Sequence, residues 1–188
     1  GKDTIVSYTP EVGNSFNKNA GDTRSRGFEL SLNQQLRSWD WRMGSTWAEH
    51  TYVDYRLSDA AGAIEDYSGK RMPQAPNHTL NAQVAWNFTP ASRLALNLVK
   101  QGSSWMNNAN TVRYAGHTLL HLNVSHKLPD GWEVWGQVRN LTDKNYSDNA
   151  ASRFIPGRGT YNPNTQNTYA AGAPRSIMVG LNKSWGGR

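Results

Sequence analysis

An alternation of apolar and polar residues with a period of two runs through most of this chain, and it constrains the fold more than any other feature. The clearest case spans residues 78–88, where Leu80, Val84 and Trp86 alternate with polar residues such as Gln83. Such a period places successive side chains on opposite faces of a strand, whereas no segment here shows the 3.6-residue period of an amphipathic helix. The sequence therefore predicts an all-β fold with antiparallel strands.

Eight segments show this alternation, each with one apolar and one polar face. They span residues 4–8, 25–36, 40–55, 78–88, 93–105, 114–128, 132–141 and 173–185. The first segment is short, and we expect it to be the end of a strand whose beginning precedes this sequence. In the last segment Ile177, Val179, Leu181 and Trp185 share the apolar face, so an aromatic residue closes the strand. That arrangement suits a strand that faces lipid.

The connections between the segments alternate in length. Short turns with turn-forming residues span 37–39, 89–92 and 129–131. Long connections span 9–24, 56–75, 107–113 and 144–172. Because short and long connections alternate, all the long loops are predicted to leave one end of the sheet. A transmembrane barrel has this asymmetry, with short turns inside the cell envelope and long loops outside.

The segments also have the dimensions that a bilayer requires. No apolar run approaches the ~20 residues that a spanning helix needs, and the mean hydropathy is -0.74. Strands of ~10 residues, tilted by about 40°, cover an apolar band ~25 Å tall. The opposite faces carry Asn, Gln, Ser, Glu, His and Lys, which need a wide lumen filled with water or protein. These features favour the strands of a transmembrane β-barrel, and a large barrel over a small one.

Composition argues against several other classes of protein. The chain has no cysteine, which excludes disulfides, thiolate metal sites and thiol nucleophiles. Its net charge is +6, but the basic residues are scattered and form no stripe, so we expect no nucleic-acid partner. His117 and His121 share a strand face but lie ~13 Å apart, too far to chelate one metal ion. No recognisable acid pair occurs among the glutamates, which include Glu29, Glu49, Glu65 and Glu133. We expect no enzyme activity, cofactor or metal site.

Four short motifs occur in order along the chain. Residues 21–30 contain Arg-Gly-aromatic-Glu, and residues 69–80 contain Pro-x-x-Pro-x-His. Residues 139–146 contain Asn-Leu-Thr-Asp-Lys-x-Tyr, and residues 173–176 place Ala-Pro-Arg before the last strand. Together these motifs are specific and span the whole chain. On them the chain resembles the TonB-dependent outer-membrane receptors of Gram-negative bacteria.

The resemblance implies a single domain over residues 1–188, formed by the last eight of about 22 barrel strands, with the N-terminal plug domain absent. Such receptors lie in the outer membrane and take up a scarce nutrient, usually a ferric siderophore, when TonB supplies energy. The implied partners are outer-membrane lipid, the remainder of the barrel, the plug domain, TonB and the ferric siderophore. Without the plug this chain alone is not expected to transport anything.

Two positions depart from the family pattern. Members usually end on Phe or Trp, whereas Gly186, Gly187 and Arg188 follow Trp185 here. Lys183 occupies a position where an outward aromatic residue is usual, although a lysine near the membrane interface can extend its ammonium group towards water.

The motif residues and the loops supply the candidate site residues. We expect Asn140 and Asp143 to cap the backbone where a strand leaves the membrane, and Arg175 to order the start of the final strand. The residues with a structural role in the motifs are Gly27, Glu29, Asn140, Leu141, Asp143, Tyr146, Pro174, Arg175 and Trp185.

The long loops supply the candidate ligand-binding residues. Anionic ferric chelates suit arginine for charge and aromatic rings for stacking. The candidate ligand-binding residues of the loops are Arg153, Phe154, Arg158, Tyr161, Tyr169, Trp105 and Tyr67.

Two alternative functions fit parts of the sequence. Eight strands can close a small barrel that serves as an adhesin or a structural protein, but the polar face is then difficult to accommodate. A secreted β-sandwich that binds sugar would explain the many tryptophans, but not the alternation of short and long connections.

Overall fold

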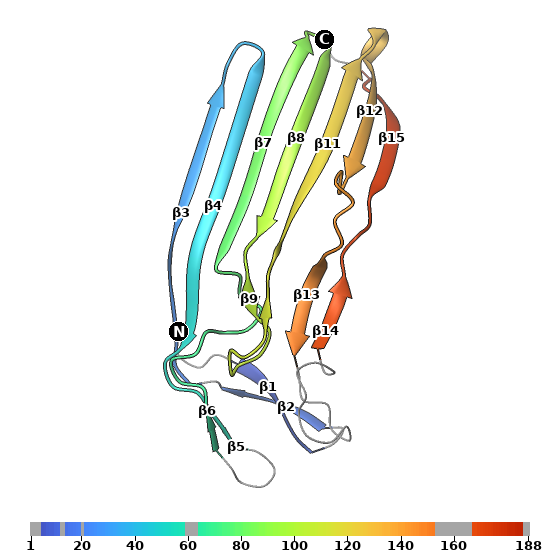
Figure 1. Cartoon of the computed structure of the whole chain (residues 1–188). Coiled ribbons are helices and arrows are strands. Elements are labelled where there is room, and N and C mark those ends of the chain that lie inside the picture. The colour runs from blue at the N-terminus through green and yellow to red at the C-terminus, as the bar shows by residue number, and fades with distance from the viewer. Residues whose placement is uncertain (1–4, 12–13, 20, 59–63, 153–166, 186–188) are drawn as a thin grey trace.

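The structure, a computed structural model, describes residues 5–11, 14–19, 21–58, 64–152 and 167–185. Seven long strands form one antiparallel sheet in the order β15-β12-β11-β8-β7-β4-β3 (Figure 1). These strands are β3 (Thr23–Gln35), β4 (Trp39–Tyr52), β7 (His78–Thr89), β8 (Ser92–Gln101), β11 (His117–Lys127), β12 (Trp132–Arg139) and β15 (Ser176–Lys183). The predicted all-β, antiparallel class is confirmed, and each long strand overlaps a segment predicted from the alternation.

Residues 4–8 were predicted to end one of eight strands of a single sheet, but the large sheet in the described residues has seven strands. The strand β1 (Ile5–Glu11) does not join the large sheet but pairs with β2 (Asn14–Asn19) in a separate two-stranded hairpin. Alternation predicts that a segment is extended, but it does not choose the partner strand. The neighbouring segment is the closest partner along the chain, and a short loop closes at a small entropic cost.

The long connections carry small hairpins at one end of the sheet, and the short turns lie at the other end (Figure 1). The hairpins are formed by β5 (Arg56–Ser58) with β6 (Ile64–Asp66), β9 (Ser104–Trp105) with β10 (Arg113–Tyr114), and β13 (Ser147–Ser152) with β14 (Asn167–Ala171). The turn at Pro129–Gly131 is a short 3-10 helix, η1. The predicted separation of long loops from short turns is therefore present, and we call the two ends the loop end and the turn end.

Two predicted strands are broken near the loop end. The segment 93–105 divides into β8 and β9, and 114–128 divides into β10 and β11. Gly116, just before β11, has φ +84°, and a side chain there would overlap the carbonyl oxygen of Gln101. Only glycine adopts this backbone conformation without strain and also allows the close approach.

The strand register gathers the apolar residues of the alternation on one face of the sheet, although Leu119, Trp135 and Met178 lie on the opposite face. One transverse row runs through the paired residues Leu32, Met43, Ala82, Leu98 and Leu120. We call this side the apolar face and the opposite side the polar face. Many large side chains of the apolar face are exposed, among them Phe28, Val84, Leu96, Val124, Ile177 and Val179. A face this apolar on every strand requires a lipid or protein environment.

Aromatic side chains mark both ends of the apolar face. At the loop end Phe28 stacks on Trp47, with ring centroids 4.6 Å apart, and Trp47 stacks on His78 at 4.8 Å. At the turn end Trp39 stacks on Trp86 at 5.3 Å. Trp39 and Trp47 are separated by about 26 Å along β4, or roughly 20 Å across the membrane if the strand tilts by about 40°. The spacing matches the two aromatic girdles that border an apolar band.

Lys183 lies at the turn end of the apolar face, within the second girdle. Its Nζ lies 5.0 Å from the ring centroid of Trp132 and 5.4 Å from that of Trp185. The ammonium group therefore has two aromatic neighbours, which reduces the penalty for a charge at the edge of the apolar band.

β3 and β15 form the two edges of the large sheet, so the described strands make an open sheet and not a closed barrel. Within the described residues, no helix is both long and apolar enough to cross a membrane.

Candidate ligand-facing surface

The polar face of the large sheet contains a hollow of about 610 Å³ near its middle. Its wall combines charged, amide and imidazole side chains, including Arg42, Gln83, Asn97, His121, Arg139 and Asn140. These residues come from β4, β7, β8, β11 and β12, so most of the width of the sheet contributes to one surface.

The register of the sheet explains why these side chains meet. Arg42 pairs with Gln83, Gln83 with Asn97, and Asn97 with His121, so the four lie in one transverse row. Each belongs to the polar half of the alternation in its own strand. The sequence predicted which face each residue occupies, but the row itself depends on register, which alternation alone does not fix.

The hollow presents positive charge and hydrogen-bond donors. Arg42 and Arg139 line it, and its wall contains no Asp or Glu. The nearest described acid on β4, Asp40, is already paired with Arg93 at 2.6 Å. A surface with two guanidinium groups and several amides suits an anionic molecule or the polar surface of another protein segment.

A tyrosine cluster lies at the loop end, beyond the Phe28–Trp47–His78 aromatic row. Tyr52 and Tyr55 are almost fully buried, with ring centroids 4.4 Å apart, and Tyr67 lies 5.8 Å from Tyr55. Burial raises the pKa of Tyr52 to about 12, and the neighbouring Tyr55 adds to the rise. Burial also raises the pKa of Tyr67, whose hydroxyl donates to the carboxylate of Glu65. All three hydroxyls therefore stay protonated at neutral pH.

Hydrogen bonds join two of the loop-end hairpins to each other and to β4. The hydroxyl of Tyr52 donates to Oδ1 of Asn108 at 3.1 Å, which links β4 to the turn between β9 and β10. The amide of Ser152 donates to the carbonyl of Met106 at 2.9 Å, which links β13 to the same turn. Met106 itself is 2% exposed, so this small hairpin has a buried centre of its own.

Three of the seven candidate ligand-binding residues lie in the described part of the chain. Tyr67 belongs to the tyrosine cluster, Trp105 lies 5.7 Å beneath the guanidinium of Arg113, and Tyr169 is exposed on β14. A hydrogen bond from Ser152 to Met106 joins the hairpins of Tyr169 and Trp105, but no ring contact joins the three candidate residues within the described part of the chain. The other four, Arg153, Phe154, Arg158 and Tyr161, lie outside the described residues. Tyr52 and Tyr55 were not among the candidates because neither belongs to a motif. Their position at the end of the predicted strand 40–55 was the one signal that could have pointed to them.

Asn140 has the most extensive hydrogen bonding of the motif residues. Its backbone adopts φ 49°, and only 2% of its surface is exposed. Its Nδ2 donates to the carbonyls of Lys144 and Ala173, while its Oδ1 accepts from the amide of Lys144 at 2.8 Å. Its own amide donates to Nδ1 of His121 at 3.0 Å, which engages one nitrogen of that imidazole. Asn140 therefore connects the end of β12 to the segment that leads into β15.

Asp143, Arg175 and Tyr146 strengthen the same connection. Oδ1 of Asp143 accepts from the amide of Arg175 at 3.3 Å, and its Oδ2 lies 3.5 Å from Nη2 of that residue. The hydroxyl of Tyr146 accepts from the amide of Ala173 at 3.2 Å, and its ring lies 4.5 Å from that of His117. Pro174, between these contacts, lines the hollow. The side chains of Asn140, Asp143 and Tyr146 thus bond to the backbone that leads into β15. We call this arrangement the clamp between β12 and β15.

The remaining motif residues lie on the strands or at their ends. Gly27 pairs with Ala48, and Glu29 pairs with Thr46 on the polar face. The amide of Leu141 donates to the carbonyl of Leu120 at 2.8 Å, which extends the pairing of β11 and β12. Trp185 is 84% exposed at the turn end. Among the described residues no cluster of three or more His, Asp or Glu side chains is suited to hold a metal ion.

A family model supports what the fold and motifs indicate. The model of the TonB dependent receptor-like β-barrel matches residues 2–141 of the chain. The siderophore receptor PiuA from Acinetobacter baumannii has a similar structure, with a TM-score of 0.74 and 19% sequence identity over 96% of this chain. The match covers 24% of PiuA, so this chain spans about a quarter of the length of such proteins.

Other solved structures show the same fold with different cargoes. BauA, the ferric preacinetobactin receptor from A. baumannii, matches with a TM-score of 0.65 and 22% identity, over 94% of this chain and 25% of BauA. The copper transporter OprC matches with a TM-score of 0.67 and 16% identity, over 98% of this chain and 27% of OprC. At these identities the likeness establishes the fold and not the cargo. With the family model matched over most of its length, this chain belongs to the TonB-dependent receptor-like β-barrel family.

Proposed function

We propose that this chain is the C-terminal part of the barrel of an outer-membrane receptor, and that the complete receptor takes up an anionic ferric siderophore with energy from TonB. The observation that carries the proposal is the polar face. It holds a hollow of about 610 Å³ with Arg42 and Arg139 in its wall, and the opposite face of the sheet exposes the apolar side chains that a membrane-spanning wall needs. A lumen of this kind accommodates a plug domain and an anionic cargo.

The orientation follows from the two ends of the sheet. The hairpins and the tyrosine cluster lie at the loop end, which we place outside the cell, and Trp185 lies at the periplasmic rim. Tyr67, Trp105 and Tyr169 then belong to the outer layer that meets the cargo first. Arg153, Phe154, Arg158 and Tyr161 complete the proposed set.

The structure gives no support to the two alternative functions. A self-contained barrel would pair β3 with β15, whereas both are edges of the described sheet. A sugar-binding sandwich needs two sheets packed face to face, whereas the long strands form one sheet with an exposed apolar face.

The test uses the full-length gene and a strain in which it is deleted. We expect the deletion to abolish uptake of one radioactive ferric siderophore under iron starvation, and a strain without TonB to show the same loss. Restoring the full-length gene restores uptake, whereas the segment 1–188 alone does not. Uptake of a copper complex but of no ferric siderophore would show that the cargo is wrong. An upstream reading frame without a plug or further alternating strands would contradict the receptor itself.

A further inference from the structure

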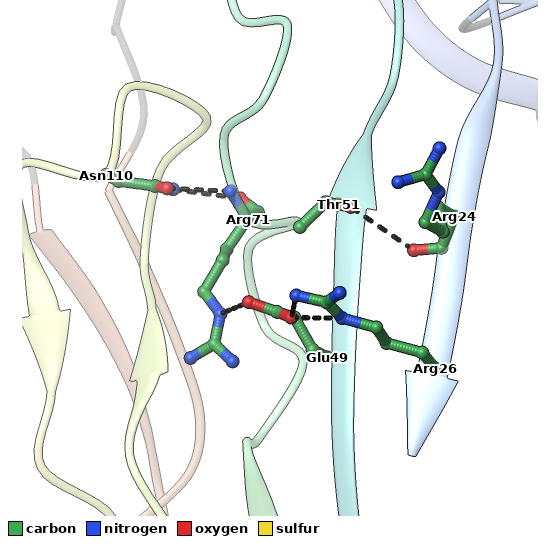
Figure 2. A network of polar contacts seen from close by, with 6 residues as sticks. All are labelled: Arg24, Arg26, Glu49, Thr51, Arg71 and Asn110. Atoms are coloured by element: carbon green, nitrogen blue, oxygen red, sulfur yellow. Dashed lines mark hydrogen bonds and ion pairs between the residues drawn. The ribbon is translucent and has the colours of Figure 1, made fainter.

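Figure 2 shows a cluster of charged residues from β3, β4 and the connection before β7. The strand register places it at the loop end of the apolar face, opposite the polar face. Nε and Nη2 of Arg26 on β3 lie 2.7 and 2.6 Å from Oε2 of Glu49 on β4. Nε of Arg71 lies 3.4 Å from Oε1 of the same carboxylate. Arg24 lies two residues before Arg26 and therefore on the same face of β3. We call Arg24, Arg26, Arg71 and Glu49 the outer basic cluster.

Arg71 belongs to a connection, yet its backbone is held in place from both sides. Its amide donates to Oδ1 of Asn110 at 2.8 Å, and its carbonyl accepts from Nδ2 of the same residue at 2.8 Å. It also forms an antiparallel bridge with Thr51 on β4. Figure 2 shows the resulting arrangement, with the arginines on either side of Glu49. The fold thus holds the backbone of Arg71 beside β4, and the carboxylate of Glu49 holds the guanidinium groups of Arg26 and Arg71.

The cluster has a defined height relative to the membrane. Arg26 and Glu49 lie two residues beyond Phe28 and Trp47 on their strands, which is about 7 Å towards the loop end. Aromatic girdles lie at the level of the lipid headgroups. The guanidinium groups therefore lie at or just above the headgroups, facing lipid and not the lumen.

The charge of the cluster suits an anion. The guanidinium groups of Arg26 and Arg71 share the carboxylate of Glu49, and Arg24 adds a third positive charge on the same face of β3, so the cluster has a net charge of +2. The side chains of Arg26 and Arg71 remain 72% and 35% exposed, so donors are left for a further partner. Phosphate oxygens accept paired hydrogen bonds from such groups.

We propose that the outer basic cluster binds the phosphate groups of a phosphorylated glycolipid in the outer leaflet, with the Phe28–Trp47–His78 row against its acyl chains. This inference rests on the proposed function in one respect: the proposed orientation of the barrel places the cluster in the outer leaflet. The cluster attaches the barrel wall to specific lipids and takes no part in contacting the cargo.

The test measures lipid binding by the full-length receptor in detergent, using native mass spectrometry with lipid A, phosphatidylglycerol, phosphatidylethanolamine and inorganic phosphate as separate probes. The variant Arg24→Gln with Arg71→Gln leaves the Arg26–Glu49 pair intact. Each neutralised arginine is expected to lower the association constant about fivefold, so the pair lowers that for lipid A roughly 25-fold. The matched control is Arg42→Gln with Arg139→Gln, which removes the same charge from the polar face and should leave lipid A binding unchanged.

Four results would overturn the inference: an unchanged association constant in the cluster variant, an equal loss in the control, a preference for phosphatidylglycerol over lipid A, or binding of inorganic phosphate as tight as that of lipid A. Uptake of ferric siderophore by the wild-type receptor is measured in parallel. The two proposals can therefore fail separately. If the cluster variant loses lipid A binding but the wild type takes up no ferric siderophore, this inference stands and the proposed cargo is wrong.

Discussion

Arg93 on β8 and Asp40 on β4 form a two-point ion pair that crosses the intervening strand β7. Nη1 of Arg93 lies 2.6 Å from Oδ2 of Asp40, and Nη2 lies 2.8 Å from Oδ1. The pair crosses β7 near Ala85, which pairs with both Asp40 and Ala95. Both alanines are buried, and their small side chains leave room for the longer ones above them. The contact fixes three strands relative to one another on the polar face.

Removing either partner is expected to weaken the barrel modestly. Arg93→Ala or Asp40→Asn should lower the free energy of unfolding by about 1 kcal/mol, because the pair is bidentate but remains partly exposed to water. Guanidinium unfolding of the full-length receptor in lipid vesicles measures the change. The double variant should lose less than the sum of the two single losses. Strict additivity in this cycle would show that the two side chains do not interact.

Asn140 is expected to be among the most sensitive positions. Alanine there removes the side-chain bonds to Lys144 and Ala173 and lacks the short polar side chain by which asparagine tolerates a φ of 49°, so we expect a loss of about 3 kcal/mol. Glycine removes the same bonds but tolerates the backbone, and should lose about 2 kcal/mol. The same unfolding assay separates the two effects. Equal stability of the alanine variant and the wild type would rule out the clamp between β12 and β15.

The alternation predicts the strands because strand faces are a local property of the sequence. All seven strands of the large sheet, and the face of each, follow from it. The partner of β1 does not follow from the alternation, because pairing depends on competition between distant and nearby segments. The hairpins within the long connections were missed because their strands show no alternation: β5 and β6 each span three residues, too few to show a period, and β13 has the sequence Ser-Asp-Asn-Ala-Ala-Ser.

The candidate ligand-facing surface was less predictable than the fold. The row from Arg42 to His121 exists because four strands adopt one register, and a shift of one residue would move each side chain to the other face. The clamp at Asn140 could be anticipated from its motif, since Asn and Asp often bond to nearby backbone. The tyrosine cluster joins Tyr52 and Tyr55 to Tyr67 across a connection, and nothing local in the sequence encodes that contact.

Two glycines of the polar face should respond differently to the same substitution. A β-carbon at Gly180 would overlap the indole ring of Trp135, whereas one at Gly44 would meet nothing within 4 Å. Gly180→Ala is therefore expected to displace Trp135 and lower the free energy of unfolding by about 1–3 kcal/mol. Gly44→Ala is the matched control, and its unfolding free energy should stay within about 0.5 kcal/mol of the wild type. Similar losses in both would show that Trp135 does not cover Gly180.

The tyrosine cluster should make the loop end sensitive to alkaline pH. Tyrosines of an unfolded chain ionise near pH 10, whereas burial raises the pKa of Tyr52 to about 12. Because the folded pKa is the higher one, the stabilising contribution is fully present below about pH 10 and is lost as pH rises towards 12. Burial also raises the pKa of Tyr55 and of Tyr67.

Hydrogen exchange of the loop-end amides should therefore accelerate above about pH 10 in the full-length receptor, after correction for the intrinsic rate. The variant Tyr52→Phe should reduce that acceleration, whereas Tyr169→Phe, at an exposed tyrosine, should not. An equal reduction in both variants would mean that the response does not come from the buried cluster.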